Sequence, residues 1–137
     1  MLAKDAMWHG NAPAEPDSLN LLRVAAGVEL PDDYLRFLAF SDGGEGPLGV
    51  DPGYIVIDPV NDVVAHKKNR TFEEFFPGFL VFGGNGGGEL LAFDIRSSGP
   101  WPVVMIAMTN IDLSESVVRI AADFSELLKS IGNDTRT

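Results

Sequence analysis

The sequence contains no cysteine and only two histidines among its 137 residues. Without cysteine the chain can form no disulfide, no reactive thiolate and no cysteine-ligated metal site. Long apolar runs are also missing, because Val103–Met108 is far shorter than the ~20 residues of a membrane-spanning helix. The N-terminus has no apolar stretch of the length that a signal peptide requires. We therefore expect a cytoplasmic protein that has no membrane partner.

The histidines are poorly placed for catalysis or for binding a metal. His66 follows Asp62 by four residues, so the two can share one helix face, but a zinc site typically takes three or four protein ligands. His9 lies in an N-terminal segment rich in glycine and proline, and no Gly-x-Ser-x-Gly motif is present. We expect no catalytic residues, no metal and no cofactor. An active site assembled from distant acids stays open, as an enzyme of unknown class.

A run of glycines interrupted by one asparagine, Gly83–Gly88, invites comparison with a phosphate-binding loop. It has neither the Gly-x-Gly-x-x-Gly pattern nor Gly-Lys-Ser/Thr, and it joins two apolar segments without opening a helix. We interpret it as the turn of a hairpin between Phe79–Phe82 and Leu90–Ile95. Asn85 and Gly86 are predicted to supply the positive φ angles of that turn.

Acidic residues outnumber basic ones by 20 to 10, and the excess is concentrated in one part of the chain. Between Glu29 and Asp62 there are eight acids and one base, Arg36, so this stretch carries a charge of −7. Such a field repels nucleic acid and anionic lipid and attracts cationic partners. We therefore expect no nucleic acid as a partner. Solubility alone is the alternative explanation for the acidic excess.

The first half of the chain predicts three helices and one short strand. Residues 1–16 are expected to be a loose arm, with Trp8 as its contact to the body, and residues 133–137 a short tail. The first helix is predicted to have Asp17 as its N-cap and to stop at Gly27, and to pack on a second helix that begins after Pro31. Tyr54–Ile57 is predicted to be a strand. Asp58 and Pro59 then start a third helix.

The second half predicts mainly strands. Thr71–Glu74 has the pattern of a capping box for one further helical turn. After the hairpin, Trp101–Met108 is predicted to be a strand buried on both faces, and Val117–Ile120 a short strand. Asp123 and Glu126 form a second capping box, which predicts a last helix over Phe124–Ile131. Residues 17–132 thus form one α+β domain.

Four segments, in this order and spacing, resemble the SUKH superfamily of fungal cell-wall-synthesis regulators and bacterial immunity proteins. They are Leu30–Leu38, Ser41–Gly44, Phe79–Gly88 and Ala121–Leu128. Asp94 also fits an acid that ends a strand in this pattern. The resemblance implies a mixed, mainly antiparallel sheet flanked by helices, and no catalysis.

The resemblance implies a non-enzymatic protein-binding module, in first place an immunity protein that neutralises a polymorphic toxin, often a nuclease. The acidic stretch agrees, because a nuclease has a basic groove for phosphates. A regulatory or scaffold protein with an endogenous partner is the alternative, and the sequence predicts no oligomeric state. Tyr54 and Trp101 are candidates for contact with a basic toxin domain, although the core is the favoured place for both aromatic residues. The full set of candidates is Asp42, Glu45, Asp51, Tyr54, Glu89 and Trp101.

Overall fold

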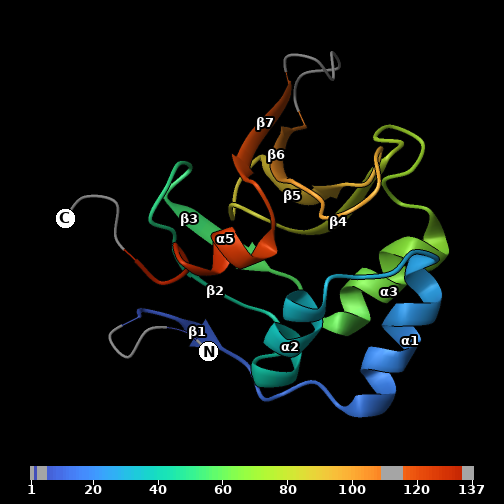
Figure 1. Ribbon diagram of the computed structural model, residues 1–137, viewed down its shortest axis with the longest axis horizontal. Helices are drawn as coiled ribbons and strands as arrows, with labels where there is room; N and C mark the ends of the chain where they lie inside the picture. The colour runs from blue at the N-terminus through green and yellow to red at the C-terminus, as the bar shows by residue number, and fades with distance from the viewer. Residues whose placement is uncertain (1, 3–5, 109–115, 134–137) are drawn as a thin grey trace.

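The seven strands of the sheet follow one another in space in the same order as in the sequence (Figure 1). The computed structural model describes residues 2, 6–108 and 116–133. Every described strand pair is antiparallel, so the predicted α+β fold with a mainly antiparallel sheet is confirmed, whereas the parallel component implied by "mixed" is not found among these strands. The strands are β1 (His9–Gly10), β2 (Gly44–Pro47), β3 (Tyr54–Ile57), β4 (Phe79–Gly84), β5 (Glu89–Asp94), β6 (Val103–Ala107) and β7 (Val117–Ala121).

The helices begin and end close to the predicted positions, but their caps differ. They are α1 (Pro16–Ala26), α2 (Asp32–Phe40), α3 (Val60–Asn69) and α5 (Phe124–Leu128). Asp17 is not the N-cap of α1, because Pro16 already starts the helix and Glu15 takes the cap position. Gly27 ends α1 with a φ of 69°, as expected. The predicted contact between α1 and α2 exists, but α1 packs more extensively on α3.

The prediction that Asp58 and Pro59 start α3 places the N-cap one residue too early. Pro59, not Asp58, is at the N-cap position, and the side chain of Asp58 makes no capping bond. Instead, the backbone N–H of Val60 donates to Oδ1 of Asp42, at 2.8 Å, across 18 residues of sequence. A side chain from the turn after α2 therefore satisfies one of the free N–H groups of α3.

The neighbouring residue in that turn, Ser41, attaches the N-terminal segment to the domain. Its buried Oγ accepts hydrogen bonds from the backbone N–H of Asn11, at 3.1 Å, and from Nε1 of Trp8, at 3.4 Å. The same hydroxyl donates to the carbonyl oxygen of Gly43, at 2.6 Å. Trp8 also meets the ring of Phe37 edge-on. Trp8 therefore contacts the body as predicted, whereas residues 1 and 3–5 of the expected arm, and 134–137 of the expected tail, lie outside the described residues.

The face of the sheet that packs against the helices, here called the inner face, carries the main core (Figure 1). Its centre is a cluster of fully or almost fully buried rings from α2, β4, β5 and α5. The ring of Tyr34 lies edge-on to three others at centroid distances of 5.1–5.4 Å. These three rings belong to Phe82, Phe93 and Phe124.

The opposite or outer face of the sheet has a smaller apolar cluster under a thinner cover. Phe79, Val81, Ala92 and Val104 belong to it, in the alternation expected of strands. It is covered in part by half-buried phenylalanines of the segment 71–77. The predicted capping box at 71–74 does not give a regular helix here, since the segment forms consecutive turns.

The predicted hairpin of β4 and β5 is confirmed, with one correction to its turn. The strands pair from Phe79 and Asp94 to Gly84 and Leu90, with a bulge between Val81 and Gly83. Gly86 has a φ of 81°, but Asn85 does not adopt a positive φ. The Asn85 side chain acts instead, because its Oδ1 accepts from the N–H groups of Gly87 and Glu89.

The C-terminal part also agrees with the sequence. The strand β6 lies between β5 and β7 and is buried on both faces, and Val117–Ala121 is a strand as predicted. Asp123 caps α5 by accepting from the N–H of Glu126, at 2.8 Å. The helix ends at Leu128, three residues earlier than expected, and a turn leads to Gly132.

Candidate functional site

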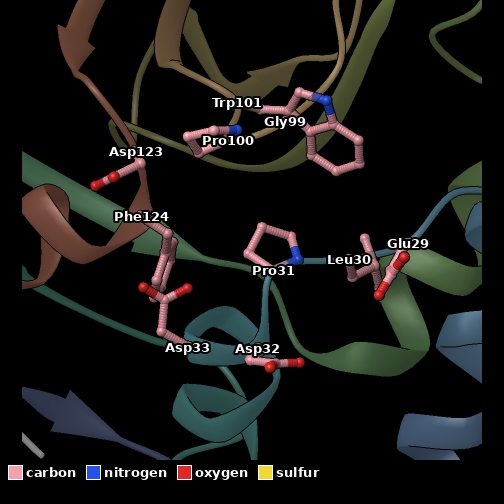
Figure 2. Close-up of a pocket in the computed structure, with 10 residues that line it drawn as sticks. All are labelled: Glu29, Leu30, Pro31, Asp32, Asp33, Gly99, Pro100, Trp101, Asp123 and Phe124. Atoms are coloured by element: carbon pink, nitrogen blue, oxygen red, sulfur yellow. The ribbon is translucent and has the colours of Figure 1, made fainter.

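A hollow of about 420 Å³ opens where the first residues of α2 and α5 meet the loop before β6, and we call it the acidic groove (Figure 2). Pro31 and Pro100 face each other across it, and Trp101 forms part of one wall. Asp33 and Asp123 lie toward one end, and Glu29 lies at the other. The lining consists of Glu29, Leu30, Pro31, Asp32, Asp33, Gly99, Pro100, Trp101, Asp123 and Phe124.

Each wall of the acidic groove is held by local structure. The turn Gly27–Leu30 places Glu29 ahead of α2, and Asp32 and Asp33 form the first turn of that helix. Trp101 is fixed by its indole, whose Nε1 donates to the carbonyl oxygen of Ser97, at 2.9 Å. Helices α2 and α5 touch each other, and the carboxylates at their N-terminal ends line the same hollow.

The charge of the groove has one sign. Four carboxylates line it, and its lining contains no lysine or arginine. Those of Asp32, Asp33 and Asp123 also favour their own helices, because a negative charge stabilises a helix N-terminus. Glu29 is exposed and belongs to no helix, so it has no such role. The groove can therefore accept a positively charged group against apolar walls of proline and tryptophan.

The six candidate contact residues do not form one site. Trp101 lines the acidic groove, although it is only 9 % exposed and so also belongs to the core. Tyr54 is 37 % exposed and lies outside the core. Partial burial, and the charge and hydrogen bond of Glu45, raise the pKa of Tyr54 above its usual value. Glu45 and Tyr54 thus lie together on β2 and β3, away from Trp101.

The other three candidates have different surroundings. Asp42 caps α3, which gives it a structural role. Asp51 is exposed in the turn between β2 and β3. Glu89 begins β5, where its Oε1 accepts a hydrogen bond from Nδ2 of Asn85 at 2.8 Å. The three acids therefore differ: Asp42 caps a helix, Asp51 is exposed, and Glu89 is half-buried and holds Asn85.

Sequence reasoning missed the acidic groove itself. The sequence predicts Asp123 only as part of a capping box, and it counts Glu29, Asp32 and Asp33 only in the −7 stretch. One feature of the sequence could have indicated the groove: both α2 and α5 start with acidic residues, and both helices have apolar residues that can pack together. These acids meet beside Trp101 because α2 and α5 are in contact. The two helices are about 90 residues apart in the chain, and no short motif in either of them predicts that contact.

A comparison with profiles of protein families identifies the family of this chain. The profile of the SMI1 / KNR4 family (SUKH-1) matches residues 13–130, which is most of the chain. The chain belongs to this SUKH family. A search among curated proteins found no match. The family assignment therefore confirms the resemblance seen in the sequence, and it supports a module that interacts with other proteins.

The SUKH assignment also explains why the motif segments are poor candidates for specificity. Leu30, Phe82 and Phe124 are buried in the inner core, and Ser41 is a buried polar anchor. In the described residues no helix is long and apolar enough to cross a membrane. The same residues contain no group of three potential metal ligands from histidine, cysteine, aspartate and glutamate.

Proposed function

We propose that this SUKH domain is a non-enzymatic immunity protein that binds and neutralises a basic toxin domain, and that the acidic groove receives a lysine or arginine side chain of that toxin. The observation that carries the proposal is the lining of the groove, in which four carboxylates face no basic residue. An arginine can stack on an aromatic wall while it pairs with a carboxylate, and Trp101 and Glu29 offer both.

The net charge supports the same proposal from a longer range. A chain of charge −10 attracts a cationic domain before contact, which raises the association rate. Exposed charges contribute about 0.2–1 kcal/mol each to affinity, whereas a desolvated pair in the groove contributes more. Steering by the whole surface and selection by the groove are therefore separate effects.

The test takes toxin domains encoded by the genes adjacent to this one, and finding none there would count against the proposal. Co-expression of the protein should restore growth of cells that produce the toxin. In stopped-flow experiments, Glu29→Lys/Asp33→Lys should reduce the association rate about tenfold or more at low salt. It should also raise the dissociation rate, because the pair formed in the groove is lost.

The control variant is Asp17→Lys/Glu74→Lys, which makes the same change in net charge outside the groove. Asp17 is exposed in the first turn of α1, as Asp33 is placed in the first turn of α2, so the effect on helix stability is matched. This variant should slow association only slightly and leave dissociation unchanged. Failure to restore growth would overturn the toxin partner, and equal effects of both variants would overturn the groove as its binding site.

A further inference from the structure

A second hollow lies on the outer face of the sheet, beside the hairpin turn of β4 and β5, and we call it the hairpin cavity. Its volume is about 220 Å³. It is bounded by the end of β3, by α3 and the segment after it, by the glycine-rich turn and by Met108. The walls are mostly apolar, with Val56, Phe72, Val81 and Leu90 among them. This cavity shares no residue with the acidic groove.

Three ionisable side chains enter the lining of the hairpin cavity, and two of them have polar atoms without a hydrogen-bond partner among the described residues. Asp58 is half-buried, and its carboxylate makes no hydrogen bond or ion pair with any described residue. The Nδ1 atom of His66 is buried and lacks a hydrogen-bond partner among the described residues. The third, Glu89, uses one oxygen to hold Asn85. Among the described residues, no lysine or arginine lines the cavity.

Leaving such groups without partners costs free energy in the folded protein. Burial raises the pKa of Asp58, and the charge of Asp62 adds to this, although nearby His66 lowers it. The Nδ1 atom of His66 is buried from solvent without a partner, and such an atom destabilises the folded state. Asp58 does not cap α3, so its carboxylate has no role in that helix start. The ring of His66 lies edge-on to Phe72, with the ring centroids 5.0 Å apart, and this contact does not use the nitrogen atoms as hydrogen-bonding groups. Unpaired polar groups in a cavity are typical of a binding site.

We propose that the hairpin cavity binds a small organic cation, an ammonium or guanidinium group on a short apolar stem. The carboxylates of Asp58 and Glu89 would pair with the cationic head, and the aliphatic and phenylalanine walls would cover the stem. The head satisfies Asp58 with charge-assisted hydrogen bonds, which are stronger than neutral ones. An anion is disfavoured because the lining holds two carboxylates and no fixed positive charge.

The glycine-rich turn gives the ligand access. A side chain at Gly84 would come within 2.7 Å of the carbonyl oxygen of Glu89, so this glycine is required by the turn itself. In contrast, a side chain at Gly87 would meet only Oδ1 of Asn85, at 3.5 Å, and one at Gly88 would meet nothing within 4 Å. Gly87, which lines the cavity and is exposed, therefore leaves it open, and its backbone amide can report binding.

The experiment is a titration followed by amide chemical shifts, with butylguanidinium chloride as the probe. The amides of Gly86, Gly87 and Glu89 should shift and saturate, with a dissociation constant of about 1 mM or lower. Butanol, with the same stem but no charge, and butyrate, with the opposite charge, should bind at least about tenfold more weakly. Asp58→Asn should weaken butylguanidinium binding about tenfold or more, because it removes a charge-assisted contact.

The matched control is Asp62→Asn, which removes the same charge from an exposed position of α3 outside the cavity. It should change the dissociation constant less than about threefold. A capped peptide with one central arginine forms the second arm, and tighter binding of the peptide than of butylguanidinium identifies a protein side chain as the source of the cation. Tighter binding of butylguanidinium identifies a free small molecule.

Three results would overturn the proposal. These are an absence of saturable shifts with either cation, equal binding of butanol, and equal losses for Asp58→Asn and Asp62→Asn. The variants make no use of the acidic groove, so failure here leaves the proposed toxin binding untouched. Conversely, a protein that restores no growth in the toxin assay can still bind the cation.

Discussion

The two faces of the sheet are built from the same strands but covered in different ways. On the inner face, helices bring Tyr34 and Phe124 onto Phe82 and Phe93, and these last two rings stack at 4.2 Å. On the outer face, the half-buried Phe72 and Phe76 provide a partial cover, and a cavity remains beside the hairpin. The centre of the inner face is therefore closed by packed rings, whereas the outer face keeps a cavity.

The largest effect is expected for the inner rings. Phe93→Ala should lower the free energy of unfolding by about 3–5 kcal/mol, because it leaves a cavity among rings that cannot collapse together. Phe76→Ala on the outer face should cost about 1–2 kcal/mol, since that side chain is already half exposed. Urea denaturation measures both values. Equal losses would show that the two faces contribute alike and would break the comparison.

A smaller effect is expected at the polar anchor that joins the N-terminal segment to the inner core. Ser41→Ala removes one hydroxyl that serves Asn11, Trp8 and Gly43, so it should cost about 1–3 kcal/mol. Hydrogen exchange should also become faster for the amides of β1. A variant with unchanged stability and exchange would mean that β1 is held by its strand pairing with β2 alone.

The opposite sign is expected for the buried hydroxyl of Tyr34. Tyr34 is fully buried, and its hydroxyl has no hydrogen-bond partner among the described residues. Burial, followed by the charges of Asp58 and Asp42, raises its pKa, so the group stays neutral. Tyr34→Phe should therefore keep the ring contacts and stabilise the fold by about 1 kcal/mol in thermal or urea unfolding. A loss of stability would indicate that the hydroxyl has a partner in solution.

The smallest effects concern pH, and they should differ in sign between two carboxylates at the strand ends. The hydrogen bonds from Arg96 outweigh partial burial and lower the pKa of Asp94. Its stabilising contribution is present above the unfolded-state pKa and is lost as the pH falls through the folded-state value. Asp94→Asn should thus cost about 0.2–1 kcal/mol at neutral pH and reduce the loss of stability in acid.

Asp58 should behave in the reverse direction, because burial raises its folded-state pKa. The folded state then holds the proton more tightly than the unfolded state, so stability falls as the pH rises from the unfolded-state pKa through the folded-state value. Asp58→Asn should remove this decrease while it leaves the Asp94 effect intact. Unfolding curves between about pH 3 and pH 7 test both variants, and parallel profiles would contradict the assignment.

The sequence by itself determined most of the elements and their order. Alternating and continuous apolar runs predicted β3 to β7, and the capping box at Asp123 predicted α5, because these signals act over a few residues. The same local signals failed where a helix cap can come either from a neighbouring residue or from a distant one. Asp58 looked like the cap of α3, yet the carboxylate that bonds to Val60 belongs to Asp42, which only folding brings near.

Only the tertiary structure decided where function can reside. Acids counted along the chain gave the −7 stretch, but the groove combines Glu29 with Asp123 and Trp101 from distant segments. Likewise His66 and Asp62 attracted attention by their spacing, whereas His66 shares a cavity with Asp58 and Glu89. Local sequence sets the conformation of each element. Burial and the meeting of distant side chains depend on how those elements pack, which no short stretch of sequence specifies.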